Sequence, residues 1–332
     1  MAREAKPHRS GEFDLIAKYF APLAAAAPGA LALTDDAALI QVPTGQELVV
    51  SSDALVASVH FRSDDSPDLV ARKALRVNLS DLAAMGAAPV GYTLATMLPR
   101  DIEESWIAAF AAGLAADQKA FGLSLLGGDT TATPGPLSLT VTIFGLVPAG
   151  RALLRRGARP GDLVAVSGTI GDGALGLDAA SGALAGLSAE DANFLAGRYR
   201  LPQPRLALGQ ALRGIASAAL DISDGLVADL GHIAQGSGVG MRLRVASIPL
   251  SPAAARAVAR DGTRRGRILA GGDDYELALT ISPENSTKLA GIAEATAVPI
   301  TVIGEVVAGQ GVRVADEAGR EIGLPAGGYA HF

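Results

Sequence analysis

The stretch SPDLVARKALRVNLSDLAAMG, residues 66–86, decides how the first half of this 332-residue chain folds. Its apolar residues recur at helical spacing, and it ends at Gly86, where a helix C-cap belongs. The segment VGYTLATML at 90–98 follows and is typical of a strand. Asn78 and Asp81 are three residues apart, so they share one face near the end of the predicted helix. A helix followed by a strand indicates an α/β fold, here with two oxygen-bearing side chains at one helix end.

Helices and strands alternate along the rest of the chain. In the first half we expect a helix at 12–20, a strand at 47–52 that delivers Asp53 at its end, a helix at 103–121 and a strand at 137–147. The stretch LVAVSGTIGDGALGL at 163–177 opens a second unit with a strand, a glycine-rich turn and a helix. Further helices are expected near 191–216 and 224–236, and further strands near 239–245, 275–281 and 299–304. The sequence therefore predicts two domains with mixed α/β sheets, residues 1–148 and 149–332.

The composition narrows the class of protein. The chain is acidic, with a net charge of −6, and has no lysine- or arginine-rich run, so we expect no nucleic-acid interface. No run of apolar residues is long enough for a membrane span, and the first residues lack the apolar core of a secretory signal. The chain contains no cysteine, which fits a reducing compartment. A soluble cytoplasmic protein without a membrane partner is expected.

Aspartate recurs beside small residues in six separate segments. They are TDDAAL at 34–39, SSDAL at 51–55, NLSDLAAMGA at 78–87, GGDTT at 127–131, DISDGL at 221–226 and GGDDYEL at 271–277. A single such aspartate is more often a turn residue or a helix cap, and Asp224 has the position of an N-cap for a helix at 225–236. Six segments would need six unrelated caps, whereas one functional site explains all of them.

Clustered carboxylates in a chain with no cysteine and only four histidines favour a hard divalent cation. A glycoside hydrolase would also use two carboxylates, but only 4% of the residues are aromatic and there is one tryptophan to stack on sugars. Mg²⁺ takes one or two carboxylates per ion together with phosphate oxygens, so six aspartates would serve several ions. Like charges about 4 Å apart repel by about 4 kcal/mol at an effective dielectric constant near 20. An acidic pocket therefore accepts a nucleotide triphosphate only with intervening metal ions.

The known nucleotide motifs are missing. No Gly-Lys pair occurs, which excludes a P-loop, and the protein-kinase HRD and DFG triplets are absent. The turn SGTIGDGALG at 167–176 fits a phosphate cradle and a tight strand-to-helix connection equally well. GGDDYEL matches the GGDEF loop of diguanylate cyclases only superficially. His60 fits a phosphate contact or simple packing beside Phe61, and Arg155 fits a phosphate contact or an exposed loop position.

Taken in order, the segments resemble a known family. GEFDLIAKYF, TDDAAL, SSDALVASVHF, KALRVNLSDLAAMGA, LGGDTT, DISDGLVADLGHI, GGDDYEL and a terminal HF resemble the thiamine-monophosphate kinases, whose superfamily includes aminoimidazole ribonucleotide synthetase. The resemblance implies the two-domain fold of that superfamily, with amino-terminal sheets that form a barrel in a homodimer. It also implies Mg²⁺-dependent, direct in-line transfer of the ATP γ-phosphoryl group to thiamine monophosphate, which gives thiamine diphosphate and ADP.

The resemblance further implies the site residues. Those that would hold Mg²⁺ are Asp36, Ser51, Ser52, Asp53, Asp81, Asp129, Asp221 and Asp224. Those that would contact ATP are Gly128, Asp129, Arg155 and Ser223. Those that would contact thiamine monophosphate are His60 and Asp273. No residue acts as a covalent nucleophile or a strong base, because the acceptor oxygen is already anionic.

Three positions depart from the family pattern. Asp273 stands where the family has Glu, Ala326 aligns with an aromatic residue that stacks on thiamine, and Ala330 stands where Asp is usual. Tyr329 is positioned to compensate for the missing aromatic. The alternatives are another ATP-dependent enzyme of the superfamily or a nucleotide-binding relative without catalysis. Selenophosphate synthetase and the hydrogenase-maturation member both need a cysteine or selenocysteine that this chain lacks.

Overall fold

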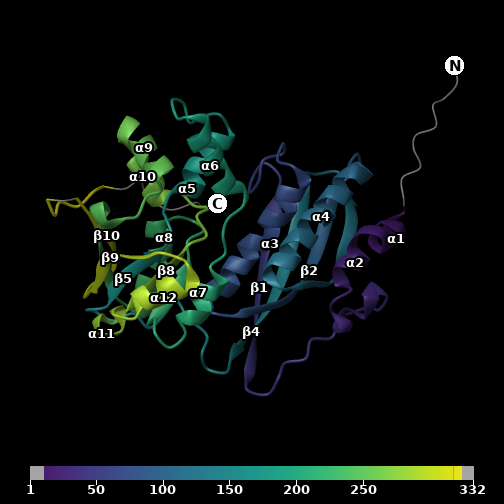
Figure 1. Cartoon of the computed structure of the whole chain (residues 1–332), viewed down its shortest axis with the longest axis horizontal. Helices are drawn as coiled ribbons and strands as arrows, with labels where there is room; N and C mark the ends of the chain where they lie inside the picture. The colour runs from purple at the N-terminus through teal and green to yellow at the C-terminus, as the bar shows by residue number, and fades with distance from the viewer. Residues whose placement is uncertain (1–10, 317, 324–332) are drawn as a thin grey trace. The chain divides into compact units, whose positions relative to one another are not determined.

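The computed structural model describes residues 11–316 and 318–323, and these form two compact units (Figure 1). Within the described residues, the first unit takes the chain up to Thr44, then Val50–Asn78 and Pro89–Gly145. The second unit takes Gly45–Val49, Leu79–Ala88 and the chain from Leu146 onward. The division runs through one helix, so Asn78 belongs to the first unit and Asp81 to the second.

The first unit is a four-stranded sheet covered by two long helices. Its strands lie in the order β1-β4-β2-β3, with β2 and β3 parallel. Their bounds are Gln46–Val56 for β1, Ala88–Pro99 for β2, Ser124–Thr133 for β3 and Ser138–Pro148 for β4. Helices α3 (Pro67–Ala84) and α4 (Glu104–Phe121) lie side by side across one face of the sheet (Figure 1). The helix predicted at 66–86 and the strand predicted at 90–98 are confirmed by α3 and β2.

A buried ion pair fixes α3 against α4. The helices approach so closely that a Cβ atom on Gly113 would lie 2.4 Å from the backbone oxygen of Asp68. Asp117 of α4 is fully buried and accepts hydrogen bonds from Arg76 Nε at 2.7 Å and from Arg72 Nε at 3.0 Å. Arg76 adds a second bond from Nη2 at 3.0 Å. These bonds hold the helix whose end carries Asn78 and Asp81.

The amino-terminal segment has irregular backbone geometry. The predicted helix at 12–20 forms as α1 (Glu12–Leu15) and continues as a π-helix, η1 (Ile16–Phe20), before α2 (Ala21–Ala24). A 3₁₀ segment, η2 (Pro28–Leu33), ends in three successive left-handed residues, with φ values of 51°, 54° and 58° at Leu31, Ala32 and Leu33. Both π-helices and left-handed non-glycine residues occur preferentially at functional sites.

The second unit is a six-stranded sheet in the order β10-β7-β9-β5-β8-β6. Neighbouring strands are antiparallel except β10 and β7, which are parallel. The bounds are Leu163–Ser167 for β5, Ala218–Asp221 for β6, Gly240–Arg244 for β7, Leu277–Ile281 for β8, Ile300–Val307 for β9 and Gly311–Ala315 for β10. The strands predicted near 239–245, 275–281 and 299–304 are confirmed by β7, β8 and β9.

Helices cover both faces of this sheet. They are α5 (Asp172–Ala180), α6 (Ala189–Arg200), α7 (Leu206–Ala211), α8 (Leu226–Ser237), α9 (Pro252–Arg260), α10 (Arg264–Ala270), α11 (Pro283–Ser286) and α12 (Leu289–Thr296), with a short 3₁₀ turn, η3 (Val245–Ser247). Val164 of β5 packs into the cluster that contains Leu230 of α8, whereas the next residue, Ala165, packs into the cluster with Leu208 of α7. Every residue of β8 is buried, as expected for a strand covered on both faces.

The helix signals near 191–216 correspond to two helices. The chain forms α6 and α7 with the segment LPQP at 201–204 between them. Proline cannot donate a helical hydrogen bond and disfavours helix in the residue before it, so Pro202 and Pro204 separate the two helices. None of the helices in the described parts of the chain is long and apolar enough to cross a membrane.

We expect Asp117→Ala to lower the free energy of unfolding by about 3–5 kcal/mol, because it leaves the buried Arg76 guanidinium without its carboxylate. Urea denaturation followed by circular dichroism measures this difference. Asp101→Ala, at an exposed position of the same unit, serves as the control and should change the free energy by less than about 0.5 kcal/mol. A small loss in Asp117→Ala would show that the ion pair does not hold α3.

Candidate functional site

A cavity of about 320 Å³ in the first unit brings together residues predicted from two distant segments. Asp36 lines it from the loop after η2, and Gly128 and Asp129 line it from β3. Glycine is required at position 128 because the backbone of Leu94 lies too close for a side chain. A Cβ atom on Gly128 would lie 1.9 Å from the backbone oxygen of Leu94. Thr96 of β2 donates a hydrogen bond to the Asp129 backbone oxygen at 3.3 Å. Three carboxylate residues, Asp35, Asp36 and Asp129, and the glycine backbone of β3 therefore line one cavity.

Strand β1 carries the three predicted ligands Ser51, Ser52 and Asp53. The expectation that Asp53 ends its strand is wrong, because β1 continues to Val56. Alternation along the strand puts Asp53 and Ser51 on one face and Ser52 on the opposite, exposed face. There Ser52 Oγ lies 2.9 Å from Thr142 Oγ1.

Two further side-chain contacts near β1 involve Asn78 and His60. The Asp53 amide donates to Oδ1 of Asn78 at 3.2 Å, and Asn78 is fully buried on α3. Asn78 thus connects α3 to β1 beside Asp53, a predicted metal ligand. The spacing of Asn78 and Asp81 in the sequence did not reveal this role. His60, in the turn after β1, accepts a hydrogen bond from the Val56 amide at Nδ1, 3.0 Å away. In the neutral imidazole the proton then lies on Nε2, which can donate to a phosphate oxygen.

In the second unit, Asp81 and Asp221 act on one another. Asp221 ends β6 and is buried, and Asp81 lies near the end of α3. Burial and, to a smaller extent, the Asp81 charge together raise the pKa of the Asp221 carboxyl to about 8, while the Ser80 hydroxyl opposes the shift. Two such carboxylates need either a proton or a cation between them, so this pair fits a metal site.

The loop after β6 is ordered by Asp229, which the sequence motifs did not single out. Its Oδ2 accepts from the amides of Ser223 at 3.1 Å, Asp224 at 3.0 Å and Gly225 at 3.0 Å. Burial raises the pKa of Asp229 to about 6, against the effect of these bonds. Helix α8 begins at Leu226 with Gly225 as its N-cap and no side-chain cap. The interpretation of Asp224 as an N-cap is therefore wrong, and its carboxylate is not used for capping.

A second loop, 271–276, packs backbone to backbone against the Ser223 loop. The Asp273 amide donates to the Ser223 oxygen at 2.9 Å, and the Tyr275 amide to the Ile222 oxygen at 2.8 Å. Gly272 has no room for a side chain, because its Cβ would lie 2.0 Å from the Ser223 oxygen. Asp273 adopts a left-handed conformation, with φ of 69°. The predicted substrate contact Asp273 and the predicted nucleotide contact Ser223 therefore lie in adjacent loops.

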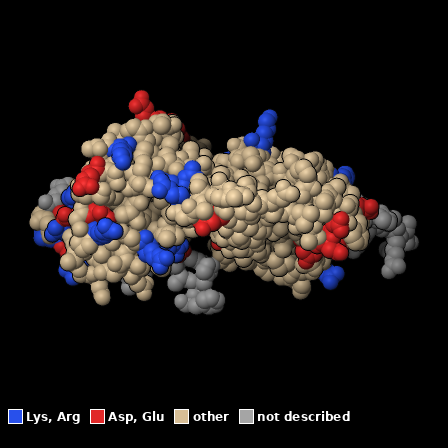
Figure 2. Space-filling model, turned by 90° about the horizontal axis from the view of Figure 1, so that it is seen from below, with Lys and Arg blue, Asp and Glu red and all other residues tan. Residues whose placement is uncertain are grey.

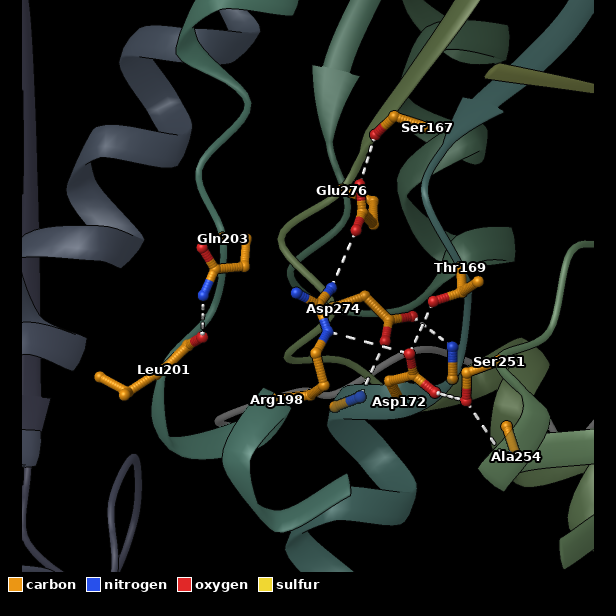
Figure 3. Close-up of polar contacts among 12 residues, drawn as sticks. Ser167, Thr169, Asp172, Arg198, Leu201, Gln203, Ser251, Ala254, Asp274 and Glu276 are labelled. Atoms are coloured by element: carbon orange, nitrogen blue, oxygen red, sulfur yellow. Dashed lines mark hydrogen bonds and ion pairs between the residues drawn. The ribbon is translucent and has the colours of Figure 1, made fainter. Parts of the chain in front are cut away.

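Loop 271–276 is anchored by buried carboxylates (Figure 3). Asp274 accepts hydrogen bonds from the Gly171 amide at 2.7 Å and the Gly173 amide at 2.9 Å, and burial raises its pKa to about 8. This arrangement favours the structural interpretation of the glycine-rich turn at 167–176, because two of its amides are occupied by Asp274. Asp172, at the start of α5, accepts from the Ser251 hydroxyl at 2.6 Å, and burial raises its pKa.

Glu276 completes this anchor. It is fully buried and accepts from the Ser167 hydroxyl, from Arg198 Nη2 at 2.8 Å and from Arg205 Nε at 2.7 Å. Glu276 thus joins the end of β5, helix α6 and the start of α7 to the loop that carries Asp273 (Figure 3). The family resemblance named Asp273 of this motif as a substrate contact but gave no role to Asp274 or Glu276.

The other predicted positions are less informative. Arg155 is exposed in the segment between β4 and β5. Ala326, Tyr329 and Ala330 lie outside the described residues. Across 11–316 and 318–323 no three acidic or histidine side chains are grouped closely enough to hold a metal ion by themselves. Asp35, Asp36 and Asp129 instead line one cavity, and Asp81 acts on Asp221 as a pair. Such small sets suit Mg²⁺, because it takes few protein ligands and completes its shell with water and phosphate.

Comparison with protein families identifies the family to which this fold belongs. Residues 34–147 match the family described as AIR synthase related protein, N-terminal domain, and residues 159–317 match its C-terminal domain. The fold and the paired carboxylates therefore define a two-domain protein of the AIR synthase related class. The hydrogenase maturation protein HypE of E. coli has the same fold, with a TM-score of 0.76 at 22% identity.

Individual relatives are more specific. The chain is 45% identical over 323 residues to the thiamine-monophosphate kinase of Caulobacter vibrioides, which covers 96% of this chain and 90% of that protein. It is 45% identical to the crystal structure of thiamine-monophosphate kinase from Stenotrophomonas maltophilia, with a TM-score of 0.78 over 85% of this chain and 89% of that one. It also matches AaThiL complexed with AMPPCP and TMP over the whole of both chains, at 29% identity and a TM-score of 0.77. The chain belongs to the thiamine-monophosphate kinase family, as the ordered motifs predicted.

The raised pKa of Asp274 predicts how stability depends on pH. Between its ordinary value of 3.8 and about 8, the folded protein retains a proton that the unfolded chain releases, so the unfolding free energy falls as pH rises. Asp274→Asn cannot titrate and removes this contribution. We therefore expect the wild type to lose stability relative to Asp274→Asn from pH 5 to pH 8, with Asp172 and Glu276, the charged neighbours of Asp274, present in both proteins.

Urea denaturation at pH 5, 6.5 and 8 measures the difference between the two proteins. The asparagine offers one acceptor to the two amides of Gly171 and Gly173, which gives a constant offset and leaves the pH trend interpretable. A stability difference that stays level across this range would show that Asp274 is ionised throughout in the folded protein.

Proposed function

We propose that this protein transfers the γ-phosphoryl group of ATP directly to the phosphate of thiamine monophosphate, giving thiamine diphosphate and ADP. The observation that carries the proposal is the cavity of the first unit, which gathers Asp36, Gly128 and Asp129 from segments some ninety residues apart. The identity of 44–45% to thiamine-monophosphate kinases over nearly the whole chain supports the same reaction. Another enzyme of the AIR synthase related class is the second candidate, and the match to relatives such as the Caulobacter kinase disfavours it.

The metal ligands are proposed from the carboxylate pairs. Asp36 and Asp129 would hold Mg²⁺ at the cavity of the first unit. Asp81 and Asp221 would hold Mg²⁺ in the second unit. The further proposed ligands, not assigned to either site, are Asp53, Asp224, Ser51 and Ser52. Ser52 lies on the opposite face of β1 from Asp53, so its backbone oxygen is the better candidate donor. Mg²⁺ held by these residues would supply positive charge that offsets the negative charge developing during phosphoryl transfer.

Side chains and backbone groups of the protein position the two substrates for the transfer. We assign Gly128, Arg155 and Ser223 to the nucleotide and His60 and Asp273 to thiamine monophosphate. The backbone bond from Asp273 to Ser223 supports a coupled arrangement of the two loops. The acceptor phosphate oxygen is already anionic, so in-line alignment suffices and no general base is needed. The side chain of Asp273 is one methylene shorter than that of the glutamate usual in the family. It must therefore contact thiamine monophosphate across a longer gap.

We also propose a homodimer that forms a barrel through the sheet of the first unit. Leu48 and Val50 are 37% and 53% exposed and lie on the same face of β1. On the face shown in Figure 2, the first unit carries few charged side chains. The division of the chain near residue 148 into two domains is likewise a proposal, supported by the family matches that end at 147 and begin again at 159. A cytoplasmic location is proposed from the lack of cysteine.

A product assay tests the reaction. Purified protein with Mg-ATP and thiamine monophosphate should form thiamine diphosphate, detected by chromatography. Product formation should stop when excess EDTA is added and resume when Mg²⁺ is restored, because the carboxylate pairs cannot accept a triphosphate without cations. Absence of product with intact binding of Mg-ATP would move the assignment to another acceptor.

The metal assignment is tested at Asp224. We expect Asp224→Asn to lower kcat by roughly 100-fold or more, because it removes a charge proposed to stabilise the transition state through the metal. The loop should persist, since its amides bind Asp229 rather than the Asp224 side chain. Asp101→Asn, exposed and remote in sequence from all six motifs, should retain full activity. Turnover close to wild type in Asp224→Asn would remove Asp224 from the metal site.

The dimer is tested by mass. Light scattering on the purified chain should give twice the 33.5 kDa of one protomer. Val50→Arg should shift the mass toward the monomer, because a charge would be buried in the proposed interface. Ala132→Arg, at an exposed position on β3, is the matched control and should leave the mass unchanged. A monomeric wild type would exclude the barrel.

A further inference from the structure

We propose that Asp229 is a positioning residue for the phosphoryl transfer. It holds the Ser223 loop, residues 222–225, in the conformation that presents the Ser223 hydroxyl to the nucleotide and the Asp224 carboxylate to Mg²⁺. The inference rests on the proposed function, which assigns Ser223 and Asp224 to those two partners. No role for Asp229 followed from the sequence motifs.

One carboxylate oxygen of Asp229 organises three consecutive amides. This oxygen, Oδ2, accepts hydrogen bonds from the amides of Ser223 at 3.1 Å, Asp224 at 3.0 Å and Gly225 at 3.0 Å. Asp229 lies in the first turn of α8 and is only 3% exposed, which shields these bonds from water. Gly225 occupies the N-cap position of α8 and has no side chain with which to cap it. Asp229 therefore satisfies, from within the helix, amides that a capping side chain would otherwise bind.

The occupied amides decide which groups of the Ser223 loop remain for ligands. Successive amides at the start of a helix commonly bind an anion such as phosphate. Here the Asp229 carboxylate fills that position. The backbone oxygen of Ser223 is also used, because it accepts from the Asp273 amide at 2.9 Å. Within residues 11–316 and 318–323, the Ser223 hydroxyl and the Asp224 carboxylate form no hydrogen bond, so these two groups are what the loop can offer to ATP and Mg²⁺.

Close packing on the opposite side leaves the Ser223 loop little freedom to shift. A Cβ atom on Gly225 would lie 2.7 Å from the backbone oxygen of Ala270. The φ of Gly225 is 128°, a value that strongly favours glycine. A change in the length of the side chain at Asp229 should therefore displace Ser223 and Asp224. A displacement of about 1 Å at a reacting group can lower the rate by roughly 100-fold.

Three substitutions separate the shape of the Asp229 side chain from its charge. Asp229→Asn keeps an oxygen acceptor at nearly the same place and removes the charge. Asp229→Glu keeps the charge and moves it by one methylene. Asp229→Ala removes the acceptor from all three amides. Asp191→Ala is the matched control, because Asp191 is a buried carboxylate in the first turn of α6, accepts from Arg256 Nε at 2.8 Å and belongs to none of the six motifs.

Two measurements on the full chain test the inference: steady-state kinetics with Mg-ATP and thiamine monophosphate, and isothermal titration with Mg-ADP. Asp229→Asn should keep kcat and Mg-ADP affinity within about 3-fold of wild type, because its side-chain oxygen still accepts from the amides. Asp229→Glu and Asp229→Ala should lower kcat by roughly 30-fold or more and weaken Mg-ADP binding by roughly 10-fold.

The KM for thiamine monophosphate should respond differently from kcat. In all three Asp229 variants it should stay within about 3-fold of wild type, because the loop of Asp273 has its own anchors in Asp274 and Glu276. Asp191→Ala should match the wild type within about 2-fold in both measurements. Thermal melting of each variant sets an assay temperature at which it is folded. If Asp229→Ala does not fold, the comparison of Asp229→Asn with Asp229→Glu decides.

Two results would overturn the inference. The first is a loss of kcat in Asp229→Asn as large as in Asp229→Ala or Asp229→Glu, because the charge of Asp229 and not the position of its oxygen would then matter. The second is wild-type kcat and Mg-ADP affinity in Asp229→Glu, because the loop would then not depend on the length of the side chain. Failure of the kinase proposal is separate. It would appear as wild-type protein that forms no thiamine diphosphate, while the Mg-ADP titrations still follow the expected order of the variants.

Discussion

The structure depends on how it stabilises buried carboxylates. Glu276 has no exposed surface, and it is held by two arginines and a serine from three different elements. Asp274 and Asp229 are satisfied instead by backbone amides. A buried charge without such partners would cost several kcal/mol, so these bonds oblige the loops to adopt one conformation. The loop of Asp273 is therefore shaped by its neighbours in sequence, Asp274 and Glu276.

The aspartates of this chain divide into two groups by their partners. Asp117, Asp172, Asp229 and Asp274 have arginine, hydroxyl or amide partners within the protein and serve the fold. Asp36 and Asp129 face a cavity, and the Asp81 charge raises the pKa of Asp221 rather than stabilising its ionised form. Carboxylates that line a cavity, or that raise one another's pKa, are favourable partners for a divalent cation.

Much of the fold followed from residue patterns. The long apolar periodicities predicted α3, α4, β2 and β4, because a helix or strand that buries one face must repeat its apolar residues at the matching period. Strands β3, β6 and β10 were not predicted, since they are short or contain glycine and polar residues that pairing partners stabilise. The end of β1 was misplaced for the same reason: Asp53 breaks the apolar pattern, but pairing within the sheet carries the strand on to Val56.

By itself the sequence determined the family, the α/β class and the segments that carry the site, because ordered motifs and periodicity are local properties of the chain. The family resemblance gave roles to Asp273 and Asp224, but it gave none to Asp274 and Asp229, which lie in the same motifs. Only the tertiary structure showed that Asp274 and Asp229 are buried against backbone amides, because burial and hydrogen bonding depend on segments such as Gly171 and Gly173 that are distant in sequence from Asp274. The cavity that joins Asp36 to Asp129 likewise exists only when the loop after η2 lies beside β3.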